Sequence, residues 1–111
     1  MNNLSQLSCL NADNKLKLNN KEINELGKCL SIQWFLSIKG ELEVEYSFKQ
    51  YMQSIEFVTR VAECAEKENH HPTLTIGYKK VKASIFTHDI GAITKADFIL
   101  AEKINIIFNS V

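Results

Sequence analysis

Hydrophobic positions along this chain recur at two spacings, and stretches of helical period alternate with stretches of strand period. Residues 1–17 follow neither spacing, because they are polar with scattered leucines, and we expect them to loop over the surface. From Asn19 the pattern becomes helical, since Asn19 and Glu22 match a capping box. The apolar positions that follow share one helical face, at Ile23, Leu26 and Leu30. This stretch predicts a first helix with one buried side.

Two stretches with a period of two residues come next. Residues 32–37 are rich in β-branched and aromatic side chains, Gly40 favours a turn, and residues 42–48 alternate apolar with polar positions. We expect these stretches to pair as a hairpin with one apolar face. Residues 49–67 return to helical spacing and predict a second amphipathic helix, with its apolar face at Ile55, Val58, Ala62 and Ala65.

A second strand pair and a last helix complete the pattern. Residues 75–78 and 81–87 predict two short strands, the second of which should direct alternate side chains into the core. His88 falls at the C-terminal tip of that strand. The last helix is predicted to begin at Thr94, because Asp97 stands three residues later as a capping partner.

The predicted order is therefore helix, two strands, helix, two strands, helix. Strands that come as hairpins imply an antiparallel sheet, and helices with one apolar face each imply that they lie together on one side of it. We predict an α+β fold, namely a two-layer domain in which a four-stranded antiparallel sheet carries the helices on one face. Residues 18–111 are expected to form this single domain, with residues 1–17 as an N-terminal extension.

Composition and charge narrow the class of protein. With 111 residues, of which 45% are hydrophobic and 23% charged, the chain suits one globular domain. Thirteen basic residues balance thirteen acidic ones, so we expect no direct nucleic-acid partner and no attraction to anionic lipid. No stretch approaches the roughly 20 apolar residues of a membrane span. The three cysteines are widely spaced, at Cys9, Cys29 and Cys64. Their odd number and spacing argue against a disulfide framework and favour a cytoplasmic protein.

All histidines of the chain lie in one segment. His70 and His71 are adjacent and precede the only proline, Pro72, and His88 follows 17 residues after the pair. Histidine exchanges a proton near neutrality because its ordinary pKa is about 6.5. This concentration predicts proton-transfer chemistry or a metal site. Adjacent histidines rarely reach one ion from a regular helix or strand, and no Cys-x-x-Cys accompanies them, so we favour proton transfer and expect no metal.

Further residues stand at set distances from the histidines. The full pattern consists of Glu66, His70, His71, Pro72, Tyr78, His88 and Asp97. Three residues separate the first two positions, and gaps of five, nine and eight residues precede the last three. This spacing resembles the signature of the pterin-4a-carbinolamine dehydratase family, and the likeness extends over about residues 18–108.

The resemblance implies dehydration of a 4a-hydroxytetrahydropterin to the quinonoid dihydropterin, a step of tetrahydrobiopterin recycling. Such a reaction needs an acid near one atom and a base near another. The resemblance implies His70 and His88 for these roles, in an order that it leaves open, and no cofactor. The implied substrate-binding residues are His71, Pro72, Glu66, Tyr78 and Asp97. It also implies a homodimer or homotetramer.

Several of these residues have a structural interpretation as well. The histidine pair can simply end a helix, and Asp97 can act only as a helix cap. Glu66 can be a solvated helix residue or can orient a histidine ring, and Tyr78 can support the fold rather than stack on a pterin. A second hypothesis for the whole chain is a protein-interaction module that acts as a dimerisation partner of a transcription factor. That function would survive the change His70→Ala.

Overall fold

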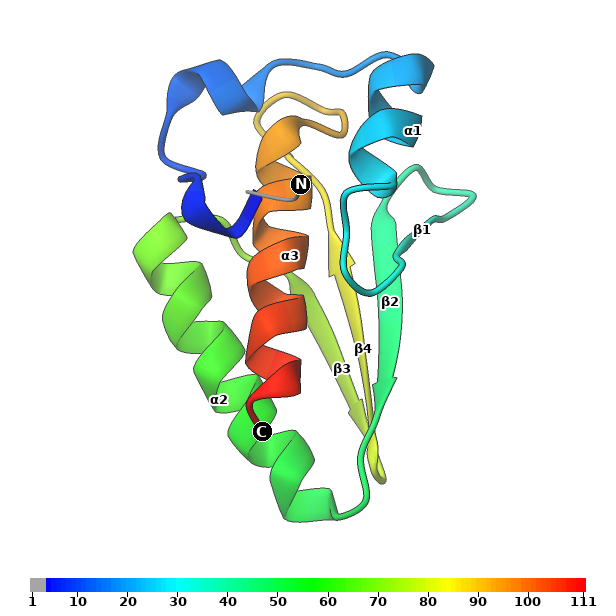
Figure 1. Ribbon diagram of the computed structural model, residues 1–111, viewed down its shortest axis with the longest axis vertical. Coiled ribbons are helices and arrows are strands. Elements are labelled where there is room, and N and C mark those ends of the chain that lie inside the picture. The colour runs from blue at the N-terminus through cyan, green and yellow to red at the C-terminus, as the bar shows by residue number, and fades with distance from the viewer. Residues whose placement is uncertain (1–3) are drawn as a thin grey trace.

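The computed structural model describes residues 4–111, and its elements follow one another in the predicted order (Figure 1). The helices are α1 (Asn20–Gly27), α2 (Tyr51–Glu68) and α3 (Lys95–Asn109). The strands are β1 (Phe35–Leu36), β2 (Leu42–Ser47), β3 (Thr73–Gly77) and β4 (Lys80–Ile85). The predicted α+β class is confirmed. No helix within residues 4–111 is long and apolar enough to cross a bilayer.

The strands form one antiparallel sheet with the order β1-β2-β4-β3. After β2 the chain runs through α2 to the far edge of the sheet, and the β3–β4 hairpin brings it back to the middle. Ala83 of β4 therefore pairs with Val44 on one side and with Leu74 on the other. Gly40, with a φ of 82°, makes the turn between β1 and β2. This order leaves β1 and β3 as the two edge strands.

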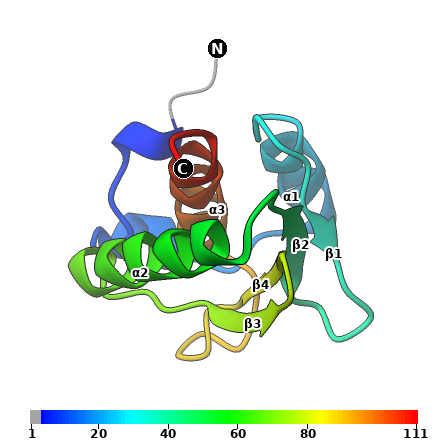
Figure 2. The same ribbon diagram turned by 90° about the horizontal axis from the view of Figure 1, so that it is seen from below.

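The three helices cover one face of the sheet, as Figure 2 shows from below. The core lies between α2, α3 and the inner faces of β2 and β4. It contains the fully buried Phe57, Val61, Val81, Ile85, Phe98 and Ile104. The opposite face of the sheet is polar, since Lys82 pairs with Glu43 at 3.3 Å and Lys80 pairs with Glu45 at 3.8 Å. The prediction of helices on one face is confirmed.

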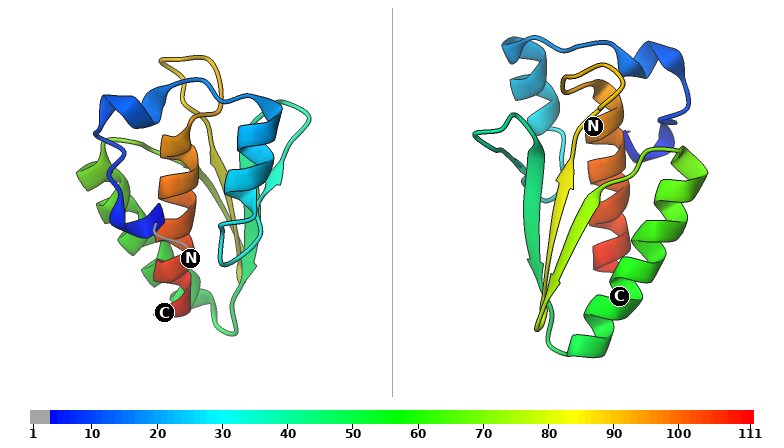
Figure 3. Two further views of the ribbon diagram at one scale, coloured as in Figure 1. Left: turned by 45° about the horizontal axis from the view of Figure 1, so that its top comes forward. Right: turned by 180° about the vertical axis from the view of Figure 1, so that it is seen from behind.

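The N-terminal extension is packed more closely than we expected. Instead of looping over the surface, its described part forms two 3₁₀ turns, η1 (Leu4–Gln6) and η2 (Ala12–Lys15), and buries Leu4 and Cys9. It crosses the N-terminal half of α3, as the left view of Figure 3 shows. The Lys103 ammonium donates to the Ser5 carbonyl at 2.8 Å. Contacts of this kind produce no periodic pattern of apolar residues in the sequence. Residues 1–3 lie outside the described part of the chain.

Candidate functional site

The end of α2 determines where the histidine pair lies. Asn69 follows the helix in the left-handed conformation, with a φ of 48°. Asparagine tolerates this conformation better than most residues, which makes it a suitable helix terminator. The His70 amide then closes the last turn by donating to the Ala65 carbonyl at 3.2 Å. The chain leaves the helix at Asn69, and it enters β3 immediately after Pro72. This ordering agrees with the prediction that the pair follows the second helix.

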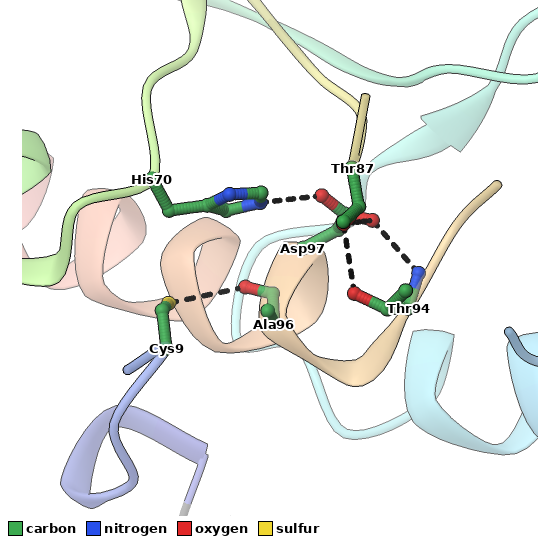
Figure 4. Close-up of polar contacts among 6 residues, drawn as sticks. All are labelled: Cys9, His70, Thr87, Thr94, Ala96 and Asp97. Atoms are coloured by element: carbon green, nitrogen blue, oxygen red, sulfur yellow. Dashed lines mark hydrogen bonds and ion pairs between the residues drawn. The ribbon is translucent and has the colours of Figure 1, made fainter. Parts of the chain in front are cut away.

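His70 is held by a buried carboxylate (Figure 4). Its Nε2 lies 2.7 Å from Asp97 Oδ1, and the two residues are 7% and 0% exposed. A carboxylate can only accept, so Nε2 carries the proton of this hydrogen bond. In the neutral ring, Nδ1 is then the nitrogen that can take up a proton. The geometry thus leaves His70 with one fixed nitrogen and one available for proton exchange.

Asp97 is itself fully engaged. Its Oδ2 accepts from the Thr94 amide at 2.8 Å and from the Thr87 hydroxyl at 2.9 Å. The first contact belongs to the predicted capping box of α3, which is present. The cap and the contact with His70 use different oxygens of one carboxylate. Asp97 therefore lies behind His70, and it does not line the cavity described below.

His71 points to a different partner. Its Nε2 lies 2.5 Å from Glu66 Oε2, and both side chains are largely exposed, at 53% and 78%. Glu66 lies on the last turn of α2, so the carboxylate reaches the ring that follows the helix. Of the two interpretations of Glu66, the geometry agrees with the one in which it orients a histidine ring.

His88 lies in the loop between β4 and α3. The strand ends at Ile85, and the loop is tightened by the Gly91 amide, which donates to the Thr87 carbonyl at 2.9 Å. Gly91 has a φ of 71°, a conformation that favours glycine. The exposed His88 ring meets Phe86 edge to face, with 5.2 Å between ring centroids. His88 thus presents its imidazole at the surface just beyond the end of β4.

One cavity brings the three histidines together. It has a volume of about 250 Å³, slightly below the range of roughly 300–1,000 Å³ that is usual for small-molecule sites. Besides His70, His71 and His88, its lining residues are Lys15, Asn69, Phe86, Thr87 and Asp89. A larger hollow of about 430 Å³ lies between α2, α3 and η1, but no histidine lines it. Histidine chemistry is therefore available only in the smaller of these two cavities.

Tyr78 is not brought to this cavity. It lies at the turn between β3 and β4, whereas the histidine pair precedes the other end of β3. Its ring is 75% exposed and stacks on Tyr51 at a centroid distance of 6.1 Å. Pro72 is partly buried beside the pair. Within residues 4–111, no three His, Cys, Asp or Glu side chains are grouped as the ligands of a metal ion would be.

Three residues of the site carry no functional prediction from the sequence. The periodic pattern places Thr87 only on a strand and Thr94 only at a helix start, yet both hydroxyls lie around Asp97 and are 2.8 Å from each other. The position of Thr87 directly before His88 could have indicated that Thr87 belongs to the site. Lys15 offers no signal, because it stands in the extension, outside any recognisable pattern.

Comparisons with known proteins assign the chain to a family. The model of a family described as Pterin 4 alpha carbinolamine dehydratase matches residues 16–107. A Rickettsia bellii protein that is provisionally named a pterin-4-alpha-carbinolamine dehydratase is 39% identical over 107 residues, which are 96% of this chain and 95% of that protein.

Two solved structures are similar as well. A Brucella melitensis protein described as a transcriptional coactivator/pterin dehydratase has a TM-score of 0.78 at 28% identity, over 83% of this chain and 98% of its own. A pterin dehydratase-like protein described as a RuBisCO assembly factor in the alpha-carboxysome has a TM-score of 0.63 over 73% of this chain and 95% of its own. At 19% identity, the second likeness shows the fold alone.

Proposed function

This chain belongs to the pterin-4-alpha-carbinolamine dehydratase family, and we propose that it converts a 4a-hydroxytetrahydropterin to the quinonoid dihydropterin by histidine acid–base catalysis. The observation that carries this proposal is the convergence of His70, His71 and His88 on one cavity. The product belongs to the recycling of a tetrahydropterin such as tetrahydrobiopterin.

The reaction needs two proton transfers at different atoms of the substrate. The bond between carbon 4a and the hydroxyl oxygen breaks, and the oxygen leaves as water after it takes a proton from an acid. A base removes the proton of a ring nitrogen, whose electrons form the new double bond. His70 and His88 are the proposed pair, one as acid and the other as base. A positioned acid or base contributes about 10²- to 10⁴-fold in rate.

The remaining predicted residues support this pair. Asp97 is a positioning residue, because its carboxylate fixes the tautomer and the orientation of His70 without reaching the cavity. We propose that His71 binds the substrate while Glu66 holds its ring. Pro72 stiffens the chain next to the pair. A contact between Tyr78 and a pterin in this cavity requires a second subunit, since Tyr78 lies at the far end of its own hairpin.

The decay of a carbinolamine, followed by absorbance, tests the proposal. We expect acceleration by the wild-type protein and a loss of at least about tenfold for His70→Ala and for His88→Ala. Asp97→Asn keeps an oxygen that can cap α3 but cannot fix the protonated Nε2 as a carboxylate does, so we expect a lower kcat with little change in KM. Asp13→Asn, at an exposed position that does not line the cavity, is the matched control.

Equal rates for the wild type and both histidine variants would overturn the enzymatic proposal. A folded wild-type protein without activity would favour the second candidate function, a protein-interaction module. The observation behind that candidate is the Brucella melitensis relative, which is described as a transcriptional coactivator as well as a pterin dehydratase. Partner binding that persists in His70→Ala would then support it.

A further inference from the structure

We propose that Lys15 of the N-terminal extension is a substrate-binding residue of the histidine cavity, and that its ammonium donates to the ring carbonyl oxygen of a bound pterin. This inference rests on the proposed function, because it names a further contact of the same site. Lys15 is the last residue of η2 and precedes the part of the chain that matches the family.

Lys15 shares the cavity with all three histidines. It is partly buried, and it lines the same 250 Å³ volume as His70, His71 and His88. Lys15 and Asp89 carry the charged groups of the lining besides the histidines. The extension pairs with the end of the loop between β4 and α3 through the bridge of Lys17 with Thr94, and Figure 1 shows the two segments together. Lys15 therefore reaches the cavity from a segment remote in sequence from His70.

The extension is anchored on both sides of Lys15. On the N-terminal side, the Cys9 amide donates to Glu68 Oε1 at 2.8 Å. The Cys9 thiol donates to the Ala96 carbonyl at 3.3 Å. On the C-terminal side, the Leu18 amide donates to the Ile93 carbonyl at 3.1 Å. Ala96 directly precedes Asp97, so the extension is attached to the helical turn that holds His70 (Figure 4). Lys15 is thereby held near the reacting groups.

The turn that carries Lys15 is also stabilised internally. The Asn11 side chain accepts from the Asp13 amide at 2.9 Å and caps η2. The Asn14 amide group donates to the Ser8 carbonyl at 3.0 Å. These bonds define the backbone of η2 independently of any ligand. A residue presented by such a turn loses little backbone freedom when it binds a substrate, which favours affinity.

The Lys15 ammonium is available for a ligand. Across residues 4–111 it takes part in no ion pair and no hydrogen bond, whereas Lys103, Lys80 and Lys82 are all paired. An ammonium has three donors and no acceptor, so it selects an acceptor on the substrate. A pterin offers a carbonyl oxygen on its pyrimidinone ring, while the reacting hydroxyl and ring nitrogen are left to the histidines.

Variants of two lysines in one segment test this assignment. Lys15→Met removes the charge, Lys15→Arg keeps it, and Lys17→Met is the matched control at an exposed position that does not line the cavity. We would measure KM and kcat for carbinolamine decay, and the Kd of 7,8-dihydropterin by fluorescence titration. Lys15→Met should raise KM and Kd about tenfold, the size expected for one charged hydrogen bond, with kcat within about twofold of the wild type.

The outcomes separate this inference from the proposed function. Lys15→Arg should retain wild-type Kd to within about threefold, and Lys17→Met should bind like the wild type. If Lys15→Met binds and turns over like Lys17→Met while the wild type accelerates the decay, the Lys15 assignment is overturned and the proposed function stands. A kcat loss at unchanged Kd would also overturn it as a binding role. A folded wild type that neither binds the pterin nor accelerates the decay would remove both proposals.

Discussion

At the scale of single residues, Asp97 shows how one side chain acquires two functions. The sequence predicted its cap of α3 from the spacing to Thr94, and the cap is present. The contact with His70 was not predictable from spacing, because the two residues are 27 positions apart and meet only in the folded chain. Asp97 is fully buried and does not line the histidine cavity. Its importance for activity is therefore expected to be indirect.

Cys9 gives a prediction on pH. Burial, together with the nearby Glu68 carboxylate, raises the pKa of its thiol from 9.0 to about 12. Between these values the unfolded chain releases the thiol proton while the folded chain keeps it, so the free energy of unfolding falls as the pH rises. The expected loss is roughly 1 kcal/mol per pH unit. Below pH 9 this contribution is fully present.

Urea unfolding at pH 8 to 11, on the wild type and on Cys9→Ser, measures this loss. We expect a shallower decline for Cys9→Ser, because a serine hydroxyl does not titrate in this range and can still donate to the Ala96 carbonyl. Part of the decline should remain, since burial also raises the pKa of Tyr46. Cys29→Ser, at a less buried position, should follow the wild type. Identical slopes for both serine variants would contradict this effect of the Cys9 thiol.

At the scale of elements, α3 organises the rest of the fold through a buried polar group. Asn105 of α3 is fully buried and accepts from the Trp34 indole at 2.8 Å and from the Tyr46 hydroxyl. Its amide group donates to the Ile32 carbonyl at 3.0 Å. These bonds draw residues 32–34 toward the helix and away from the sheet. This explains why β1 contains only Phe35 and Leu36, although residues 32–37 have strand-like composition.

The change Asn105→Leu tests how much the Asn105 side chain contributes to stability. The change keeps the volume similar but leaves the Trp34 indole, the Tyr46 hydroxyl and the Ile32 carbonyl without their partner. Each unpaired buried polar group costs about 1–3 kcal/mol, so we expect the free energy of unfolding to fall by about 3 kcal/mol or more. Urea unfolding provides the measurement, and Asn109→Leu, at an exposed site near the end of the same helix, provides the control. Equal midpoints for both variants would refute the expectation.

At the scale of the whole molecule, the sheet has an exposed edge at β3. Its Ile76 is 45% exposed, and the adjoining turn carries Tyr78 beside Tyr51 of α2. An edge strand with free backbone groups and apolar side chains favours pairing with another strand. We therefore propose that the chain forms a homodimer or homotetramer, in which β3 contributes to the contact between subunits.

Light scattering after size-exclusion chromatography tests this assembly. We expect a mass of two or four subunits for the wild type and a smaller mass for Ile76→Lys, because a charge on the edge opposes pairing. Ile38→Lys is the control, since Ile38 is fully exposed in the turn after β1, at the opposite edge of the sheet. A monomeric wild type, or an Ile76→Lys variant with the wild-type mass, would contradict the proposed role of β3.

The sequence alone determined the elements of this protein and the set of candidate residues. Helix caps, turn glycines and periods of apolar residues act over a few positions, so the helices starting near Asn19 and Thr94 and both hairpins could be predicted from local patterns. The spacing of the histidines likewise indicated the family, because a motif of fixed gaps can be read along the chain.

Only the tertiary structure decided which groups meet. The bond between His70 and Asp97, the approach of Lys15 and the separation of Tyr78 from the cavity all depend on packing between distant segments. The N-terminal extension illustrates the limit most clearly. Cys9 and Leu4 are buried, although no periodic pattern in the sequence predicts their burial. A single buried side chain in an irregular segment produces no repeating pattern.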